Sequence, residues 1–145
     1  MKKTMAMGTL LLFVVISGCA GKNSRDANLA NLGNGICQEK SSGRMWLIEK
    51  SKIFKTLPEA QEYVAHLDQG GHHDWRLPTL AELYDLNYLF DLHLNGDCDL
   101  NRSGRYWSGE KDGQGVAGAW EISDQCDPSR QYAPGSTGAI RAVRP

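Results

Sequence analysis

The segment from Asp74 to Leu83, DWRLPTLAEL, constrains the fold more than any other stretch of the chain. Pro78 disfavours helical backbone at the residue before it, so the chain is expected to run extended up to this point. In an extended segment alternate side chains point to opposite sides, so Trp75 and Leu77 share one side and Arg76 takes the other. We interpret the segment as a structural joint whose two apolar side chains enter a core.

Two helices are predicted on either side of this joint. Thr56 and Glu59 form one capping box, with Pro58 in the first turn, and Thr79 and Glu82 form another. Glu82 is also within reach of Arg76 as an ion partner. Apolar residues recur at helical spacing after each box, at Ala60, Tyr63, Val64 and Leu67 in the first helix and at Leu80, Leu83, Leu86, Leu89 and Phe90 in the second. We expect Gly70 and Gly71 to end the first helix. The joint residues are Asp74, Trp75, Arg76, Pro78, Thr79 and Glu82.

Strand patterns lie before and after the helical region. Residues 36–49 alternate loosely around a Ser-Ser-Gly turn, which predicts a hairpin. A long polar loop over residues 91–104 precedes three further strand candidates, at 105–110, 115–122 and 138–144. Helices gathered early and short strands late predict an α+β domain with an antiparallel sheet.

The N-terminus has the features of a bacterial lipoprotein signal. Two lysines precede a short apolar run, which ends in Ile-Ser-Gly-Cys, and this ending resembles the lipobox. We therefore expect a signal peptide over 1–18, an acylated Cys19 (diacylglycerol and a further acyl chain such as palmitate), a flexible tether over 19–35 and a folded domain over 36–145. An incidental cysteine after an ordinary secretory signal is the alternative. Ala20 after the cysteine favours the outer membrane of the cell envelope.

Composition argues against polyanion binding by the whole surface. The chain has 16 Lys and Arg against 17 Asp and Glu, a formal net charge of −1. Such a chain has no general basic field for nucleic acid, so nucleic acid is not expected as a partner. Any polyanion site would be a local patch.

Three cysteines remain after Cys19, an odd number for an oxidising compartment. We favour a bond between Cys98, in the long loop, and Cys126, just past a strand candidate. Cys37 would then be a buried thiol. A pair that includes Cys37 is one alternative, and three reduced cysteines are another.

Four stretches of the chain resemble the domain at the C-terminus of the Legionella collagen-like adhesin. They are SGRMW at 42–46, DWRLPT at 74–79, YWSG at 106–109 and IRAVR at 140–144. The resemblance covers nearly all of residues 36–145. It implies a fold similar to C-type lectins and formylglycine-generating enzymes, with two helices, a small twisted antiparallel sheet and a long irregular loop region. The chain departs from the pattern at Arg44, Gly109 and Ala142, and the last change removes a common cross-link partner.

No motif predicts a metal site, a cofactor or catalysis. His72 and His73 are adjacent and lack further ligands at zinc spacing. The run from Asp97 to Asn101 begins like a calcium loop, but Arg102 and Ser108 stand at the sixth and twelfth positions, where glycine and glutamate are required. The paired cysteines needed for formylglycine-type oxidation are missing. We therefore expect a protein that is not an enzyme.

A binding role is the remaining expectation. Aromatic rings stack on apolar sugar faces, and polar side chains bond sugar hydroxyls. The candidate ligand-binding residues are Asp97, Asp99, Asn101, Arg102, Arg105, Tyr106 and Trp107, with burial of Trp107 in the core as the alternative. The resemblance implies a binding or adhesion module, with glycans as one ligand class. An accessory lipoprotein that binds another envelope protein is the first alternative, and a degenerate formylglycine-generating enzyme is the second.

Overall fold

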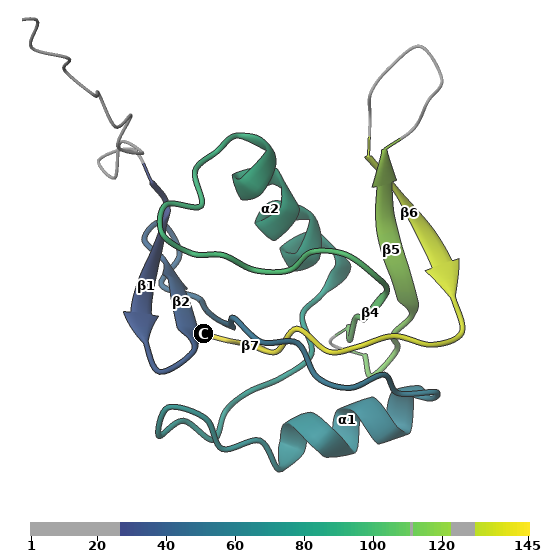
Figure 1. Ribbon diagram of the computed structural model, residues 1–145. Coiled ribbons are helices and arrows are strands. Elements are labelled where there is room, and N and C mark those ends of the chain that lie inside the picture. The colour runs from purple at the N-terminus through teal and green to yellow at the C-terminus, as the bar shows by residue number, and fades with distance from the viewer. Residues whose placement is uncertain (1–26, 111, 123–129) are drawn as a thin grey trace, which may run out of the picture.

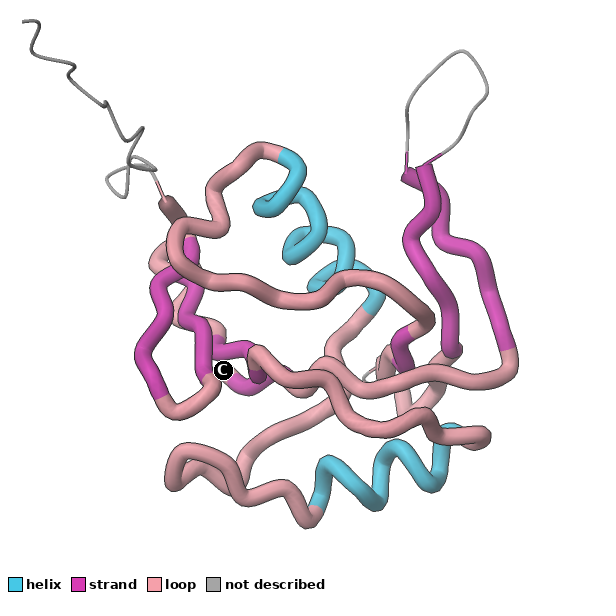
Figure 2. Tube along the Cα trace, viewed as in Figure 1, coloured by secondary structure: helices cyan, strands magenta, loops and turns pink. Residues whose placement is uncertain are grey.

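The computed structural model describes residues 27–110, 112–122 and 130–145, which form three layers with one helix on each side of a sheet (Figure 1). The helices are α1 (Leu57–Ala65) and α2 (Leu80–Asp91). The strands are β1 (Leu29–Gly33), β2 (Ile36–Glu39), β3 (Met45–Leu47), β4 (Tyr106–Trp107), β5 (Ala117–Ile122), β6 (Arg130–Gly135) and β7 (Val143–Arg144). Figure 2 shows that much of the chain between these elements is loop. The predictions for Cys19, Cys126 and the signal peptide concern residues outside the described ones.

The central sheet has the strand order β1-β2-β3-β7, and its neighbouring strands are antiparallel. The predicted hairpin around the Ser-Ser-Gly turn is confirmed, since β2 pairs with β3 in a register that places Cys37 opposite Trp46. The next strand along, β7, comes from the far end of the chain and places Val143 opposite Trp46. The sheet therefore joins residues that lie about a hundred positions apart.

Both faces of this sheet are buried, which gives the domain two apolar cores. On one face Cys37, Trp46 and Val143 pack against the buried side of α2. On the other face Ile36 and Ala142 pack against α1. Trp75 and Leu77 of the joint enter this second core, as predicted, and are 4% and 6% exposed. Neighbouring residues of one strand thus serve opposite cores, as the pleat of a strand requires.

A smaller antiparallel sheet, β4-β5-β6, stands beside the central layers. The strand β6 is not among the predicted strands, because its sequence RQYAPG contains proline and glycine. Pro134 pairs with Gly118 at the edge of the sheet, and an edge strand tolerates the missing N–H of proline. Six register pairs join β5 to β6, so this hairpin forms the longest ladder of the described chain.

The two helices begin as the capping boxes predict. At α2 the Thr79 side chain accepts from the Glu82 amide, and the Glu82 carboxylate accepts from the Thr79 amide at 2.9 Å. At α1 only half of the box forms, because the Glu59 carboxylate accepts from the amide of Lys55 instead. The helix also ends at Ala65, before the predicted glycines, which form a separate tight turn in which Gln69 bridges to His72.

The folded domain begins earlier than the predicted boundary at residue 36. Residues 29–33 form β1 and pair with β2, so this part of the predicted tether is wrong. Leu29 is only 1% exposed, and its amide together with that of Asn28 donates to the carbonyl of Leu94. The loop containing Gly96 lies so close to β1 that a Cβ there would stand 2.7 Å from the Leu29 carbonyl oxygen. Tertiary contacts of this kind leave no periodic pattern in the sequence.

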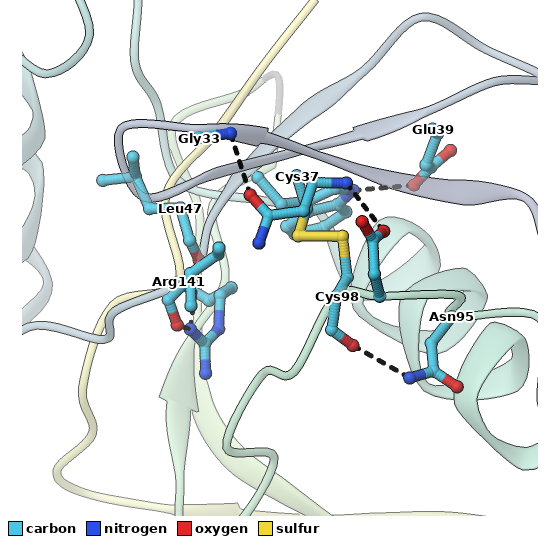
Figure 3. The surroundings of a disulfide bond; sticks show 11 residues. Gly33, Cys37, Glu39, Leu47, Asn95, Cys98 and Arg141 are labelled. Carbon is cyan, nitrogen blue, oxygen red and sulfur yellow. Dashed lines mark hydrogen bonds between the residues drawn. A yellow bond between two sulfur atoms is a disulfide. The ribbon is translucent and has the colours of Figure 1, made fainter. Parts of the chain in front are cut away.

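A disulfide joins Cys37 to Cys98 across this same loop (Figure 3). The predicted pairing of Cys98 with Cys126 is therefore wrong, and Cys37 is not a free thiol. The reason lies in the turn from Asn95 to Cys98, in which the Cys98 amide donates to the Asn95 carbonyl and the Asn95 side chain donates back at 2.8 Å. That turn holds Cys98 against the face of β2 that points toward α2, with the two Cα atoms 6.1 Å apart.

The joint connects the two cores through ionic and backbone contacts. Arg76 exchanges backbone hydrogen bonds with Val143 of β7, and its guanidinium donates to both oxygens of Glu82 at 2.7 Å. Asp74 accepts two hydrogen bonds from Arg144, at 2.6 and 3.0 Å. The predicted ion pair between Arg76 and Glu82 is confirmed, and so is the interpretation of this segment as a structural joint.

Glu82 links the stability of this joint to pH. Burial alone would raise the pKa of its carboxyl, but hydrogen bonds from Arg76 and Thr79 and the charge of Arg44 lower that pKa to about 2. A carboxyl with a lowered pKa stabilises the folded state above its unfolded pKa of about 4.3 and loses that contribution as the pH falls. We expect Glu82→Gln to cost on the order of 2 kcal/mol at pH 7, after screening by solvent, and much less at pH 2.5.

Urea unfolding of the wild type and of the Glu82→Gln variant at both pH values measures this difference. A gap between the two proteins that is equally large at pH 7 and pH 2.5 would contradict the assignment of the low pKa to Glu82.

The architecture is therefore α+β with two helices, as predicted, but it has two small antiparallel sheets in place of one. In the ranges 27–110, 112–122 and 130–145, no helix has the length and apolar character needed to cross a bilayer.

Candidate functional site

A pocket of about 460 Å³ lies along the edge of β5, and two of the sequence-predicted binding residues, Arg102 and Arg105, line it. We call it the β5-edge pocket. Its lining consists of Ile53, Arg102, Ser103, Gly104, Arg105, Ala119, Trp120, Glu121, Thr137 and Gly138. The volume is in the range of small-molecule sites in proteins. The lining offers two guanidinium groups, one carboxylate, two hydroxyls and one indole.

The pocket forms because β4 is only two residues long. Its pairing with β5 covers Ala117 and Gly118, and no described strand pairs with the rest of β5 on that side. The chain before β4 turns away instead, since the Asn101 side chain accepts from the amide and the hydroxyl of Ser103. Gly104 follows with φ +97, a conformation that favours glycine. The backbone conformation before β4 therefore produces the hollow.

The two arginines of the pocket differ in how far they are engaged. Arg102 forms an ion pair with Asp91 of α2 at 3.0 Å and lies over the ring of Phe90. Arg130 donates to the same carboxylate, and the hydrogen bonds from Arg130 and Arg102 lower the pKa of Asp91. Arg105 is exposed, and its side chain has no ion-pair or hydrogen-bond partner among the described residues. It is therefore the guanidinium that can receive a ligand.

Gly135 of β6 lies beside Arg105 and, having no side chain, leaves space for it. A Cβ at Gly135 would stand 2.6 Å from Cδ and 2.7 Å from Nε of Arg105, so the side chain lies directly over the glycine. The absence of a side chain at Gly135 therefore leaves space for Arg105, which lines the pocket.

Tyr106 and Trp107 are not ligand-binding residues, and this part of the prediction is wrong. Both are buried, at 8% and 7% exposed, and they point into opposite cores. The Tyr106 hydroxyl donates to the carbonyl of Asn101 at 2.7 Å, and the Trp107 indole donates to the carbonyl of Phe54 at 3.2 Å. The alternative expectation, burial of Trp107 in the core, is confirmed.

The acidic start of the loop does not form a single site either. An Asp97 oxygen accepts from the Asn31 amide of β1, and the Asn101 side chain is used in its own turn. Asp99 is exposed and makes no side-chain hydrogen bond within the described part of the chain. Across the described ranges, no three His, Cys, Asp or Glu side chains gather where a metal ion could be held.

The aromatic residue of the pocket is Trp120 of β5. It is partly buried, and its ring lies 5.2 Å from Tyr132 and 5.4 Å from Tyr84. Its indole N–H is buried and has no hydrogen-bond partner among the residues that the structure describes. Burial raises the pKa of Tyr132 to about 12, so this neighbour remains a neutral phenol.

The histidines of the joint take no part in a site. The His72 ring meets Trp75 edge-on at 6.2 Å, and His73 is exposed, with its Nδ1 3.7 Å from Asp68. Neither lines the hollow of about 480 Å³ beside Arg76 and Glu82, whose charges are paired with each other.

A larger hollow of about 720 Å³ lies between α1 and the segment from Lys52 to Lys55. It contains none of the sequence-predicted binding residues, and its two aromatic rings, Phe54 and Tyr63, pack against each other at 5.1 Å. We therefore place the candidate site at the β5-edge pocket.

No protein-family model, curated protein or solved structure matches this chain.

Proposed function

We propose that this protein is a lipid-anchored lipoprotein of the bacterial outer membrane, whose domain is a non-catalytic binding module for glycans. The signal and the Ile-Ser-Gly-Cys sequence at residues 16–19 support the anchor and the location. The single observation that supports the binding role is the exposed, unengaged guanidinium of Arg105 beside Trp120 in an open pocket.

The resemblance to the adhesin domain, with its lectin-like fold, remains part of this proposal. Its motif residues serve as scaffold here, because Trp46, Trp75 and Trp107 are buried and Arg141 is 2% exposed. A likeness carried by scaffold residues bears on the fold and not on the ligand. The glycan proposal therefore depends on the pocket rather than on the motifs.

The chemistry of the pocket suits a sugar. An indole can cover an apolar sugar face. Arg105 and Thr137 can donate to hydroxyl or carboxylate oxygens, and Glu121 can accept from sugar hydroxyls. A role as an accessory lipoprotein that binds an envelope protein is the second candidate, because Trp, Tyr and Arg are also the residues enriched in protein interfaces.

A glycan array with the full-length protein in detergent tests the proposal. We expect binding to at least one glycan class, and Arg105→Ala should weaken it about tenfold, the worth of one charge-assisted hydrogen bond. Lys40→Ala removes an exposed positive charge elsewhere and should leave binding unchanged. Thermal unfolding checks that both variants are folded.

Two results would contradict the proposal. Absence of binding to every glycan would favour the accessory role, and binding that is unaffected by Arg105→Ala would remove the pocket as its site.

A further inference from the structure

The helix α2 carries a second apolar face that the domain itself does not cover. Its buried side consists of Leu83, Leu86 and Leu89. Three large side chains on its other side are exposed at a spacing of four residues, namely Tyr84 at 44%, Tyr88 at 51% and Leu92, just past the helix, at 48%. A helix of a monomeric domain usually has one apolar stripe, so a second one indicates a binding surface.

The two tyrosine rings form one surface. They lie 6.2 Å apart between centroids and are within 13° of parallel. Trp120 lies behind Tyr84 at 5.4 Å and is supported in turn by Tyr132, so the β5–β6 hairpin supports the helix from the side. Neither the Tyr84 nor the Tyr88 hydroxyl bonds to a described residue. We call Tyr84, Tyr88 and Trp120 the aromatic face.

The charged side chains of α2 next to Tyr84 and Tyr88 are paired. Asp85 contacts Arg44 at 3.3 Å, and Asp91 contacts both Arg102 and Arg130. A surface that offers aromatic rings and free hydroxyls, with its neighbouring charges neutralised, is matched to an uncharged ligand. Exposed aromatic rings and free hydroxyl groups suit the sugar units of a neutral chain better than they suit a charged partner.

We infer that the aromatic face binds an uncharged oligosaccharide or polysaccharide chain, which continues from the β5-edge pocket over Trp120, the residue that the two sites share. This inference rests on the proposed function and deepens it, because it names neutral sugar chains as the ligand class and adds Tyr84 and Tyr88 as binding residues.

Affinity electrophoresis of the full-length protein in detergent provides the test. The probes are four neutral polysaccharides (a β-glucan, a mannan, a galactan and an α-glucan) and one polyuronate. We expect binding to at least one neutral probe that is insensitive to salt, since screening affects charged contacts only. Tyr84→Ala and Tyr88→Ala should each weaken it about tenfold, and the phenylalanine variants should retain most of it, since the rings remain. Tyr63→Ala on α1, which removes a similarly exposed ring, is the control.

The outcomes separate the two proposals. Binding of the polyuronate alone, weakened by salt and by Arg105→Ala, would keep the glycan module and overturn the neutral-chain inference. Neutral binding unaffected by the tyrosine variants would overturn the inference as well. A protein that binds none of these probes and no array glycan would overturn both. The tyrosine variants could instead change only the self-association of the protein, which sedimentation measures. That result would show that the face is a contact between two copies, and it would overturn the inference.

Discussion

Replacement of Cys37 by alanine is expected to lower the free energy of unfolding by about 4 kcal/mol, because the disulfide to Cys98 closes a loop of 61 residues. The bond is also buried in the α2-side core, with its two cysteines 0% and 1% exposed. Cys98→Ala should cost the same amount, and the double variant should cost no more than either single one, since all three lose the same bond. Urea unfolding under non-reducing conditions measures these differences.

A peptide map made without reduction provides the direct check. It should contain the Cys37 and Cys98 peptides joined to each other. The mass of the Cys19 peptide also shows whether the expected acylation is present. A Cys98 peptide joined to Cys126, together with a mild effect of Cys37→Ala, would contradict the structure.

Replacement of Arg141 by alanine is expected to lower the free energy of unfolding by about 3–5 kcal/mol. The guanidinium is 2% exposed and donates to the carbonyls of Leu47, Ile48 and Asn101. Backbone carbonyls surround the guanidinium, and no carboxylate of the described residues contacts it. Burial lowers the pKa of Arg141, and the nearby Tyr106 oxygen partly opposes this effect. Removal of the side chain would take a donor from each of these buried carbonyls, of which only that of Asn101 is shown to keep another, the Tyr106 hydroxyl. The loss of donors to buried acceptors is costly.

Two further variants make this prediction specific. Arg141→Lys keeps the charge but loses the planar fork, so it should also destabilise the protein, by less than alanine does. Arg144→Ala, three residues along, removes an exposed pair with Asp74 and should cost far less than Arg141→Ala does. Equal effects at Arg141 and Arg144 would contradict the structural role of the buried arginine. Thermal or urea unfolding gives all three values.

Elements with local signals could be predicted from the sequence. The capping box at Thr79 marks the start of α2, Pro78 fixes the extended joint, and the Ser-Ser-Gly turn marks the β2–β3 hairpin. Each signal acts within a few residues, which is why it can be read without the fold. The pairing of Arg76 with Glu82 belongs to this group, since the two lie six residues apart.

Elements that depend on distant contacts could not be predicted. The strand β1 is held by Leu94 and by its pairing with β2, and β6 is an edge strand in which Pro134 is tolerated. Both sequences have the composition of a loop. The disulfide belongs to this group, because cysteine connectivity does not follow from sequence.

The candidate site was predicted in part for the same reason. Arg102 and Arg105 lie close in the sequence and line one pocket, as expected for neighbours in a loop. Tyr106 follows them directly, but the pleat of β4 takes it into the core. The aromatic face needs Tyr84 of α2 and Trp120 of β5 to meet, and the helical spacing of the tyrosines was the one signal for it.

The position of the disulfide determines how the domain would respond to tension. The strand β1 is antiparallel to β2 and precedes it, with Leu29 opposite Glu39 at the end of the hairpin away from the turn. A pull on the N-terminal side would therefore peel β1 from β2 one hydrogen bond at a time and then reach Cys37. There the load would pass through a covalent bond into the loop after α2. A chain held by its N-terminus could thus lengthen by one short strand while the rest of the domain stays folded.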